Sequence, residues 1–247
     1  MKDKIIVALD VNSLKEAKPL IEALAEHVSC FKVGLELATA VGAPKVVKFI
    51  HDLGGKVFYD GKFSDIPNTV GRASKIISNL GVHMFNLHAL CGKEAMAAAV
   101  KNKGWSKVLA VTVLTSLSAR DLYDLGYPSS WPAVESYDRY AEVEDIYITS
   151  LVLRMAMVAR GAGVDGVICS LQELRSLRNF SFMKIIADVC PSWATKGDQK
   201  RVMTPAEAIK AGATALVIGR PITEPPPEIG TPVDAVKRIH DEIAAVL

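Results

Sequence analysis

Residues 57–69 read Val57-Phe58-Tyr59-Asp60-Gly61-Lys62-Phe63-Ser64-Asp65-Ile66-Pro67-Asn68-Thr69, and this stretch decides the fold. Apolar residues typical of a strand lead directly into alternating charges, and Pro67 follows at a position where a helix can begin. Apolar residues then recur at helical spacing from Val70 to Leu80. The charges therefore stand where a strand is followed by a helix. In α/β folds with parallel strands, that end of the strand is where ligands bind.

The spacing of Asp60 and Lys62 also carries chemical information. At the end of an extended strand, side chains two residues apart point to the same face. Two opposite charges held together stabilise each other's charged form. The pair thus offers a fixed negative charge and a proton donor, as needed where negative charge departs from a carbon and a proton replaces it. The alternative is a solvated surface ion pair, which would contribute only about 0–1 kcal/mol to stability.

Length and composition limit the class of protein. The chain has 247 residues, of which 50% are hydrophobic and 23% are charged. One (β/α)8 barrel takes about 250 residues, so we expect a single domain over residues 1–247. The net charge is +2 and no long basic run occurs, which argues against a nucleic-acid partner.

Cysteine usage and hydropathy point to a compartment. The four cysteines form no C-x-x-C pair and mostly adjoin apolar runs, so we expect buried thiols in a reducing environment. Lys2 and Lys4 run directly into an apolar strand without a signal-peptide pattern. No apolar stretch approaches the ~18 residues of a membrane span. We therefore expect a cytoplasmic protein with no membrane partner.

Apolar strand-like runs alternate with helical patterns along the whole chain. The strand-like runs cover residues 5–9, 29–34, 56–60, 83–88, 107–113, 164–169, 183–187 and 215–218. The helical patterns cover residues 13–26, 42–53, 70–80, 94–101, 145–162 and 233–246. This alternation predicts an α/β fold, a closed (β/α)8 TIM barrel. An open doubly wound sheet is the alternative, because periodicity does not show closure.

Two segments interrupt the alternation. Residues 118–144 exceed one ordinary connection, and we interpret them as an excursion over the barrel mouth, with Trp131 packed on the surface. Residues 188–199 form a loop that contains Pro191, Trp193 and Gly197.

Charged residues stand at the ends of the first three predicted strands. Asp10, Lys32, Asp60 and Lys62 would be neighbours in a barrel, in alternating sign. Charges near a barrel interior are costly unless paired, and apolar replacements are often no less stable, so the set favours a functional site over a structural network. After the last strand, Gly219 permits close backbone approach and Arg220 can bind a phosphate group.

With these residues in view, the chain resembles the orotidine 5'-phosphate decarboxylase family. The resemblance runs nearly end to end. Its most specific element is D-x-K-x-x-D-I-P-N-T at residues 60–69, because related phosphosugar barrels share only the D-x-K-x-x-D core. Further matches are Val7-Ala8-Leu9-Asp10, Phe31-Lys32-Val33-Gly34, Val111-Thr112-Val113-Leu114-Thr115-Ser116 and the segment from Asp198-Gln199 to Val217-Ile218-Gly219-Arg220-Pro221-Ile222-Thr223.

The resemblance implies decarboxylation of orotidine 5'-monophosphate to UMP without a cofactor or a metal. It implies Lys62, Asp60, Lys32 and Asp65 as catalytic residues. Asp60 would face the substrate carboxylate, and Lys62 would stabilise charge at C6 and deliver the proton that replaces CO2. Lys32 and Asp10 would hold the network and the ribose hydroxyls.

The resemblance also implies a homodimer with sites shared across the interface. Asp65 and Thr69 would reach into the neighbouring subunit's site. Ser116 would contact the pyrimidine, and Gln199, Gly219 and Arg220 would bind the phosphate.

One loop departs from the family pattern. The family usually carries Thr-Pro-Gly-Ile-Arg after the seventh strand, where this chain has Ala187-Asp188-Val189-Cys190-Pro191. Glycine there would let the backbone approach the ligand, so its absence affects the part of the phosphate site that the seventh loop supplies. Two alternatives therefore stay open: a phosphosugar decarboxylase or aldolase of the same superfamily, which would commonly need a divalent metal, and a non-catalytic nucleotide-binding paralogue. The five histidines show no metal-ligand spacing, and for His88 we expect a packing role.

Overall fold

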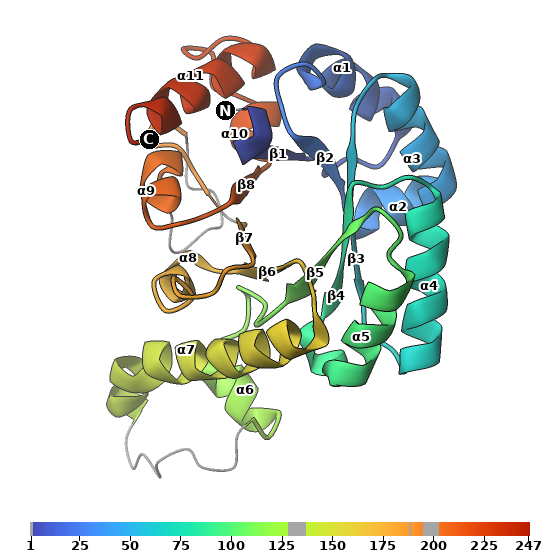
Figure 1. Cartoon of the computed structure of the whole chain (residues 1–247). Coiled ribbons are helices and arrows are strands. Elements are labelled where there is room, and N and C mark those ends of the chain that lie inside the picture. Colours follow the sequence, from blue (N-terminus) through green and yellow to red (C-terminus); the bar gives the residue numbers. More distant parts are fainter. Residues whose placement is uncertain (1, 128–136, 188, 195–202) are drawn as a thin grey trace.

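The strands form a closed parallel barrel, which excludes the open-sheet alternative (Figure 1). The computed structural model describes residues 2–127, 137–187, 189–194 and 203–247. The strands pair in sequence order, and β1 pairs with β8, with Ile6 opposite Val217. The strands are β1 (Ile5–Ala8), β2 (Cys30–Val33), β3 (Val57–Phe63), β4 (Met84–His88), β5 (Lys107–Val111), β6 (Gly166–Cys169), β7 (Met183–Ile186) and β8 (Ala215–Ile218).

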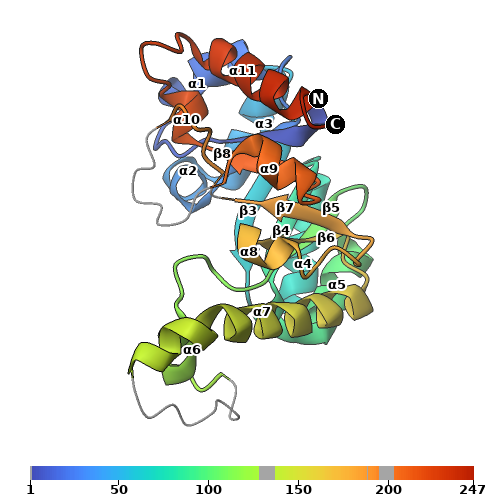
Figure 2. The same cartoon turned by 90° about the vertical axis from the view of Figure 1, so that its left-hand side faces the viewer.

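The helices surround this barrel, and the long α7 crosses one side with α6 beside it (Figures 1 and 2). Both chain termini lie near α11 in both views. The α-helices are α1 (Leu14–Leu24), α2 (Leu35–Val41), α3 (Ala43–Asp52), α4 (Pro67–Asn79), α5 (Gly92–Asn102), α6 (Ala119–Asp124), α7 (Tyr137–Ala162), α8 (Leu171–Leu174), α9 (Pro205–Lys210), α10 (Arg220–Thr223) and α11 (Pro232–Ala244). Two short 3-10 turns are η1 (Lys2–Lys4) and η2 (Ala89–Cys91).

Helix boundaries follow local capping chemistry. The Ser13 hydroxyl accepts a hydrogen bond from the Glu16 backbone N–H at 3.3 Å, so α1 begins where the sequence predicted. Other helices differ from the prediction, and the short α6, α8, α9 and α10 lie where no helix was expected. An additional helix, α2, precedes α3, and Gly42, with φ of 91°, separates the two. Helix α7 begins at Tyr137 rather than near residue 145, while Trp131 lies outside the described residues.

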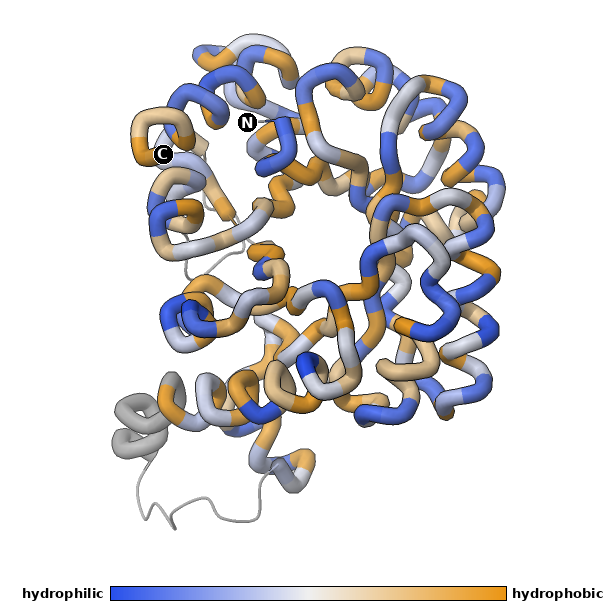
Figure 3. The backbone as a smooth tube through the Cα atoms, viewed as in Figure 1, coloured by the Kyte–Doolittle hydropathy of each residue, from blue (hydrophilic) through white to orange (hydrophobic). Residues whose placement is uncertain are grey.

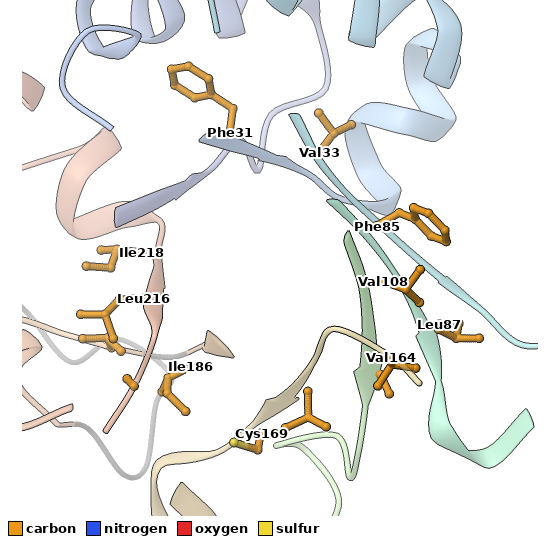
Figure 4. Packing of buried hydrophobic residues seen from close by; sticks show 14 of the residues in the cluster. Phe31, Val33, Phe85, Leu87, Val108, Val164, Cys169, Ile186, Leu216 and Ile218 are labelled. Carbon is orange, nitrogen blue, oxygen red and sulfur yellow. The ribbon is translucent and has the colours of Figure 1, made fainter. Parts of the chain in front are cut away.

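Two apolar layers hold the barrel together, since each strand is buried on both faces. An inner layer fills the barrel and includes Ile6, Phe58, Met84 and Leu109. An outer layer lies between strands and helices, and in Figure 4 Phe31, Phe85 and Leu216 point away from the barrel axis toward the helices. Along the backbone in Figure 3, the strands are mostly hydrophobic and the outer faces of the helices are marked by hydrophilic residues. The alternation of the two faces along each strand decides which side chains reach the barrel interior.

Candidate active site

Strand β3 carries the central charges on an irregular backbone. It continues to Phe63, three residues beyond the predicted end, and its register with β4 shifts between Tyr59 and Phe63. Lys62 has a φ of 47°, which makes it the one non-glycine residue with a positive φ among the residues that the structure describes. A left-handed backbone costs a residue with a side chain roughly 1–2 kcal/mol, and it persists where surrounding contacts hold it. The backbone of β3 thus aims the Lys62 side chain at some cost in stability.

The structure brings Asp10, Lys32, Asp60 and Lys62 together as a chain of ion pairs. Lys32 Nζ lies 3.1 Å from Asp10 Oδ1 and 3.5 Å from Asp60 Oδ2. Lys62 Nζ lies 2.8 Å from Asp60 Oδ1. The Asp60 side chain is only 10% exposed, whereas that of Asp10 is 63% exposed. The signs therefore alternate from the solvent-facing Asp10 to the enclosed Asp60, with both ammonium groups against the Asp60 carboxylate.

Asn86 completes the surroundings of Asp60, and the sequence analysis missed it. This residue of β4 is fully buried. Its Nδ2 donates to Asp60 Oδ1 at 2.6 Å, and its Oδ1 accepts from the Lys62 backbone N–H at 2.8 Å. The available signal was an amide in the middle of a strand that is otherwise apolar and buried on both faces.

A cavity of about 710 Å³ opens beside these charges, which is within the range of small-molecule sites. Asp10, Lys32, Asp60 and Lys62 line it together with Gly219 and Arg220 from the end of β8 and the start of α10. A Cβ atom at Gly219 would lie 3.5 Å from Asp10 Oδ2, so the ends of β1 and β8 meet closely here. The rest of the wall is mainly apolar and includes Ala8, Phe58, Val111, Val113, Ile168 and Val217.

Several predicted site residues lie elsewhere. Asp65 and Thr69 are exposed at the start of α4, outside the cavity wall of their own chain, and Asp65 Oδ1 accepts the Ile66 backbone N–H at 2.7 Å. Ser116 is also exposed, while the preceding Leu114 and Thr115 line the cavity. Gln199 lies outside the described residues.

The loop after β7 contributes Ala187, Val189 and Cys190 to the cavity wall, while Asp188 lies outside the described residues. The Cys190 backbone N–H donates to the Met203 carbonyl at 3.2 Å, and Val189 pairs with Met203 as a parallel bridge. The amide at position 190 is therefore already used within the protein. The preceding residue, Val189, stands where the family pattern places glycine, so the described part of this loop offers a ligand mainly apolar contact.

His88 lies at the end of β4, on the same side of the strand as Asn86. Burial lowers the pKa of this half-buried imidazole, the nearby Lys62 ammonium lowers it further, and Asp60 opposes the change. Its Nδ1 atom is buried without a hydrogen-bond partner. A neutral imidazole therefore borders the charge network at neutral pH.

The part of the chain that the structure describes has neither a cluster of metal ligands nor a membrane-spanning helix. No group of three or more His, Cys, Asp or Glu side chains there is arranged to hold a metal ion. No helix in that part combines the length and the apolar character of a membrane span.

Three known proteins are similar to this chain over nearly its whole length. Orotidine 5'-phosphate decarboxylase from Geotalea uraniireducens is 43% identical over 253 residues, covering 98% of this chain and 96% of the relative. The enzyme of that name from Heliobacterium modesticaldum is 42% identical over 256 residues, with the same coverage of both chains. The crystal structure of orotidine 5'-phosphate decarboxylase from Lactobacillus acidophilus superposes with a TM-score of 0.78 at 30% identity, covering 98% of this chain and 99% of that one.

The model of the orotidine 5'-phosphate decarboxylase / HUMPS family matches residues 3–239. That match includes every residue of the ion-pair chain, the Asn86 contacts and the cavity wall. Matched over nearly its full length, this chain belongs to the orotidine 5'-phosphate decarboxylase / HUMPS family.

Proposed function

We propose that this protein decarboxylates orotidine 5'-monophosphate to UMP, the activity for which its relatives are named. One observation carries the proposal: Asp60 lies at the cavity wall with Lys62 Nζ at 2.8 Å and Lys32 Nζ at 3.5 Å. The three groups join a fixed anion, a proton donor and a second cation in one enclosed place. Only a reaction that moves negative charge and a proton at neighbouring atoms uses all three.

The proposed chemistry follows from the charges. The substrate carboxylate sits against Asp60, and this repulsion raises the energy of the bound ground state. As the bond between C6 and the carboxyl carbon breaks, its electron pair stays on C6 and CO2 departs. The Lys62 ammonium stabilises the developing charge and then gives its proton to C6, and solvent returns a proton to the amine. Charge is created near the amine and removed near Asp60, so the site favours the transition state over the substrate.

Groups that bind the substrate far from C6 supply the binding free energy that offsets the repulsion between its carboxylate and Asp60. In the proposal, Arg220 and Gly219 hold the phosphate at the far side of the cavity, with Gln199 as a further ligand. Asp10 and Lys32 hold the ribose hydroxyls, and Ser116 approaches the pyrimidine. Arg220, Gly219, Asp10 and Lys32 all line the cavity, which supports this orientation.

A homodimer with shared sites forms the second part of the proposal. Asp65 and Thr69 are exposed at the start of α4 and would enter the partner's site. Large apolar side chains are exposed on the segments that follow β2, β3 and β4: Leu35 is 58%, Ile66 66% and Leu90 48% exposed. These segments share the carboxyl end of the barrel, so they offer one apolar surface beside Asp65 for a second copy.

We place the enzyme in the cytoplasm, because all four of its cysteines are free thiols.

Loss of orotidine 5'-monophosphate absorbance tests the activity directly. We expect turnover by the wild-type protein, including after EDTA treatment, and loss of turnover in Lys62→Ala. The matched control is Lys48→Ala, which removes an exposed lysine that pairs with Asp52 on α3 and does not line the cavity. Tight UMP binding without turnover would instead indicate the non-catalytic paralogue. Metal-dependent conversion of a ketose or hexulose phosphate would indicate the phosphosugar alternative.

A further inference from the structure

We propose that Asn86 is a positioning residue that fixes Asp60 and Lys62 in their reactive arrangement. The proposal rests on the proposed decarboxylase function and concerns a residue of the neighbouring strand β4. Three observations carry it: the direction of the Asn86 side chain, its two hydrogen bonds, and the backbone conformation of Lys62.

The Asn86 side chain points into the barrel because of its place in the strand. Met84 belongs to the inner apolar layer, while Phe85 and Leu87 belong to the outer layer. Side chains two residues apart share a face, so Asn86 follows Met84 inward. A fully buried amide among apolar side chains is costly unless its donors and acceptor find partners.

Both ends of the amide are used on the same two residues. Nδ2 donates to Asp60 Oδ1 at 2.6 Å, the oxygen that also accepts from Lys62 Nζ at 2.8 Å. Oδ1 accepts from the Lys62 backbone N–H at 2.8 Å. The Asn86 side chain therefore holds the side chain of Asp60 and the backbone of Lys62. It thereby sets the distance between the carboxylate and the amine.

Lys62 needs such a partner because its backbone is left-handed. The shifted register between Tyr59 and Phe63 interrupts the β3–β4 ladder at this point. At that interruption, the side-chain Oδ1 of Asn86 accepts the hydrogen bond of the Lys62 backbone N–H. This contact holds the conformation that aims the Lys62 ammonium at Asp60. Asn86 is also uncharged, so it orients the Asp60 carboxylate without cancelling its negative charge.

The first test compares Asn86→Ala with the matched control Thr112→Val. Thr112 is a buried polar residue directly after β5, and its hydroxyl donates to the Ile168 carbonyl at 3.0 Å, away from the ion-pair chain. We expect kcat of Asn86→Ala to fall by roughly 10²-fold, since a displacement of about 1 Å can cost that much. We expect its KM and its affinity for UMP to change little, because Arg220 and Gly219 are untouched. A kcat equal to that of Thr112→Val would overturn the proposal.

The second test uses pH and does not depend on the first. In Asn86→Asp, a carboxyl group would face Asp60 at hydrogen-bond distance, and two such groups share a proton, so the pKa of the pair rises. Below that pKa the protonated acid donates to Asp60 as the amide does, and above it the two carboxylates repel. We expect the ratio of kcat in Asn86→Asp to wild-type kcat to fall as pH rises, with UMP binding as the check that the variant is folded. A ratio independent of pH would contradict the positioning role, whereas a wild-type protein without turnover would refute the proposed function itself.

Discussion

Asp60 is the residue on which the site depends, because both ammonium groups lie against its carboxylate. A buried ion-pair network adds little stability compared with well-packed apolar residues. Such a network among apolar strand residues therefore indicates a role in chemistry. In the proposed reaction, the same carboxylate also opposes the negative charge of the substrate.

The substitution Asp60→Asn separates these two effects. We expect kcat to fall by about 10²–10³-fold, the usual cost of losing one preorganised electrostatic group, because Lys62 loses the anion that holds it. We expect the affinity for orotidine 5'-monophosphate to be retained or to increase, because the repulsion of its carboxylate is gone. Steady-state kinetics measure kcat and the KM for orotidine 5'-monophosphate, and calorimetric titration with UMP, which lacks the carboxylate, is the control. Unchanged kcat with weaker substrate binding would contradict the role proposed for Asp60.

Sequence reasoning found the four residues of the ion-pair chain and missed the amide beside them, as well as Glu224 in the cavity wall. The spacing of Asp60 and Lys62 and the position of Asp10 and Lys32 at strand ends were sufficient to predict that they meet. Asn86 escaped notice because a single amide in a strand has many possible partners. The role proposed for Asn86 depends on the left-handed backbone of Lys62, and no local sequence pattern around residue 62 predicts that conformation.

In strand β3, the packing of Tyr59 requires a glycine at position 61. A Cβ atom added at Gly61 would lie 2.3 Å from Cε1 of Tyr59, whose ring packs 6.0 Å from that of Phe63. Only glycine leaves room for the Tyr59 ring beside the irregular segment. Gly61 therefore links the outer packing of β3 to the direction of the Lys62 side chain.

We expect Gly61→Ala to lower both stability and kcat. Overpacking of this kind typically costs about 1–3 kcal/mol, and the forced movement of Tyr59 would displace the adjacent Lys62. Thermal unfolding and kcat are the measurements. Tyr59→Ala, alone and combined with Gly61→Ala, completes a double-mutant cycle in which the second substitution should relieve part of the first. Strictly additive effects would show that the predicted clash does not matter.

The order and type of the strands and main helices could be predicted, but several boundaries could not. Hydrophobic runs bounded by polar residues identified all eight strands. Charges within β3 resembled a strand end, so its last three residues were missed, and α2 escaped prediction beside α3. In both places the local sequence pattern was overridden by tertiary contacts or by a single glycine conformation.

Closure of the barrel is a property of the whole molecule, and the periodicity of apolar residues along the sequence does not predict it. The pairing of β1 with β8 brings Asp10 and Gly219 to the same wall, although they lie near opposite ends of the chain. The expectation of a barrel rested on the number of alternating units and on length. The pairing itself decides between a barrel and an open sheet.

The proposed homodimer with shared sites predicts complementation between two inactive variants. Lys62→Ala and Asp65→Ala should each lose activity as homodimers. In a hybrid dimer, one site would combine an intact Lys62 with an intact Asp65 from the other subunit. Random reassembly would then restore about one quarter of wild-type activity, since half of the dimers are hybrids with one of two sites intact. Mixtures that stay inactive after verified subunit exchange would contradict the shared-site arrangement.

The meeting of β1 and β8 also has a consequence for how the protein is made. The ribosome releases Asp10, Lys32, Asp60 and Lys62 first, and the wall with Gly219 and Arg220 emerges more than 150 residues after Lys62. During that interval the nascent chain carries its charge cluster with no enclosed space around it. Because a ligand stabilises only the state that binds it, nucleotide can assist folding only after release of the last strand.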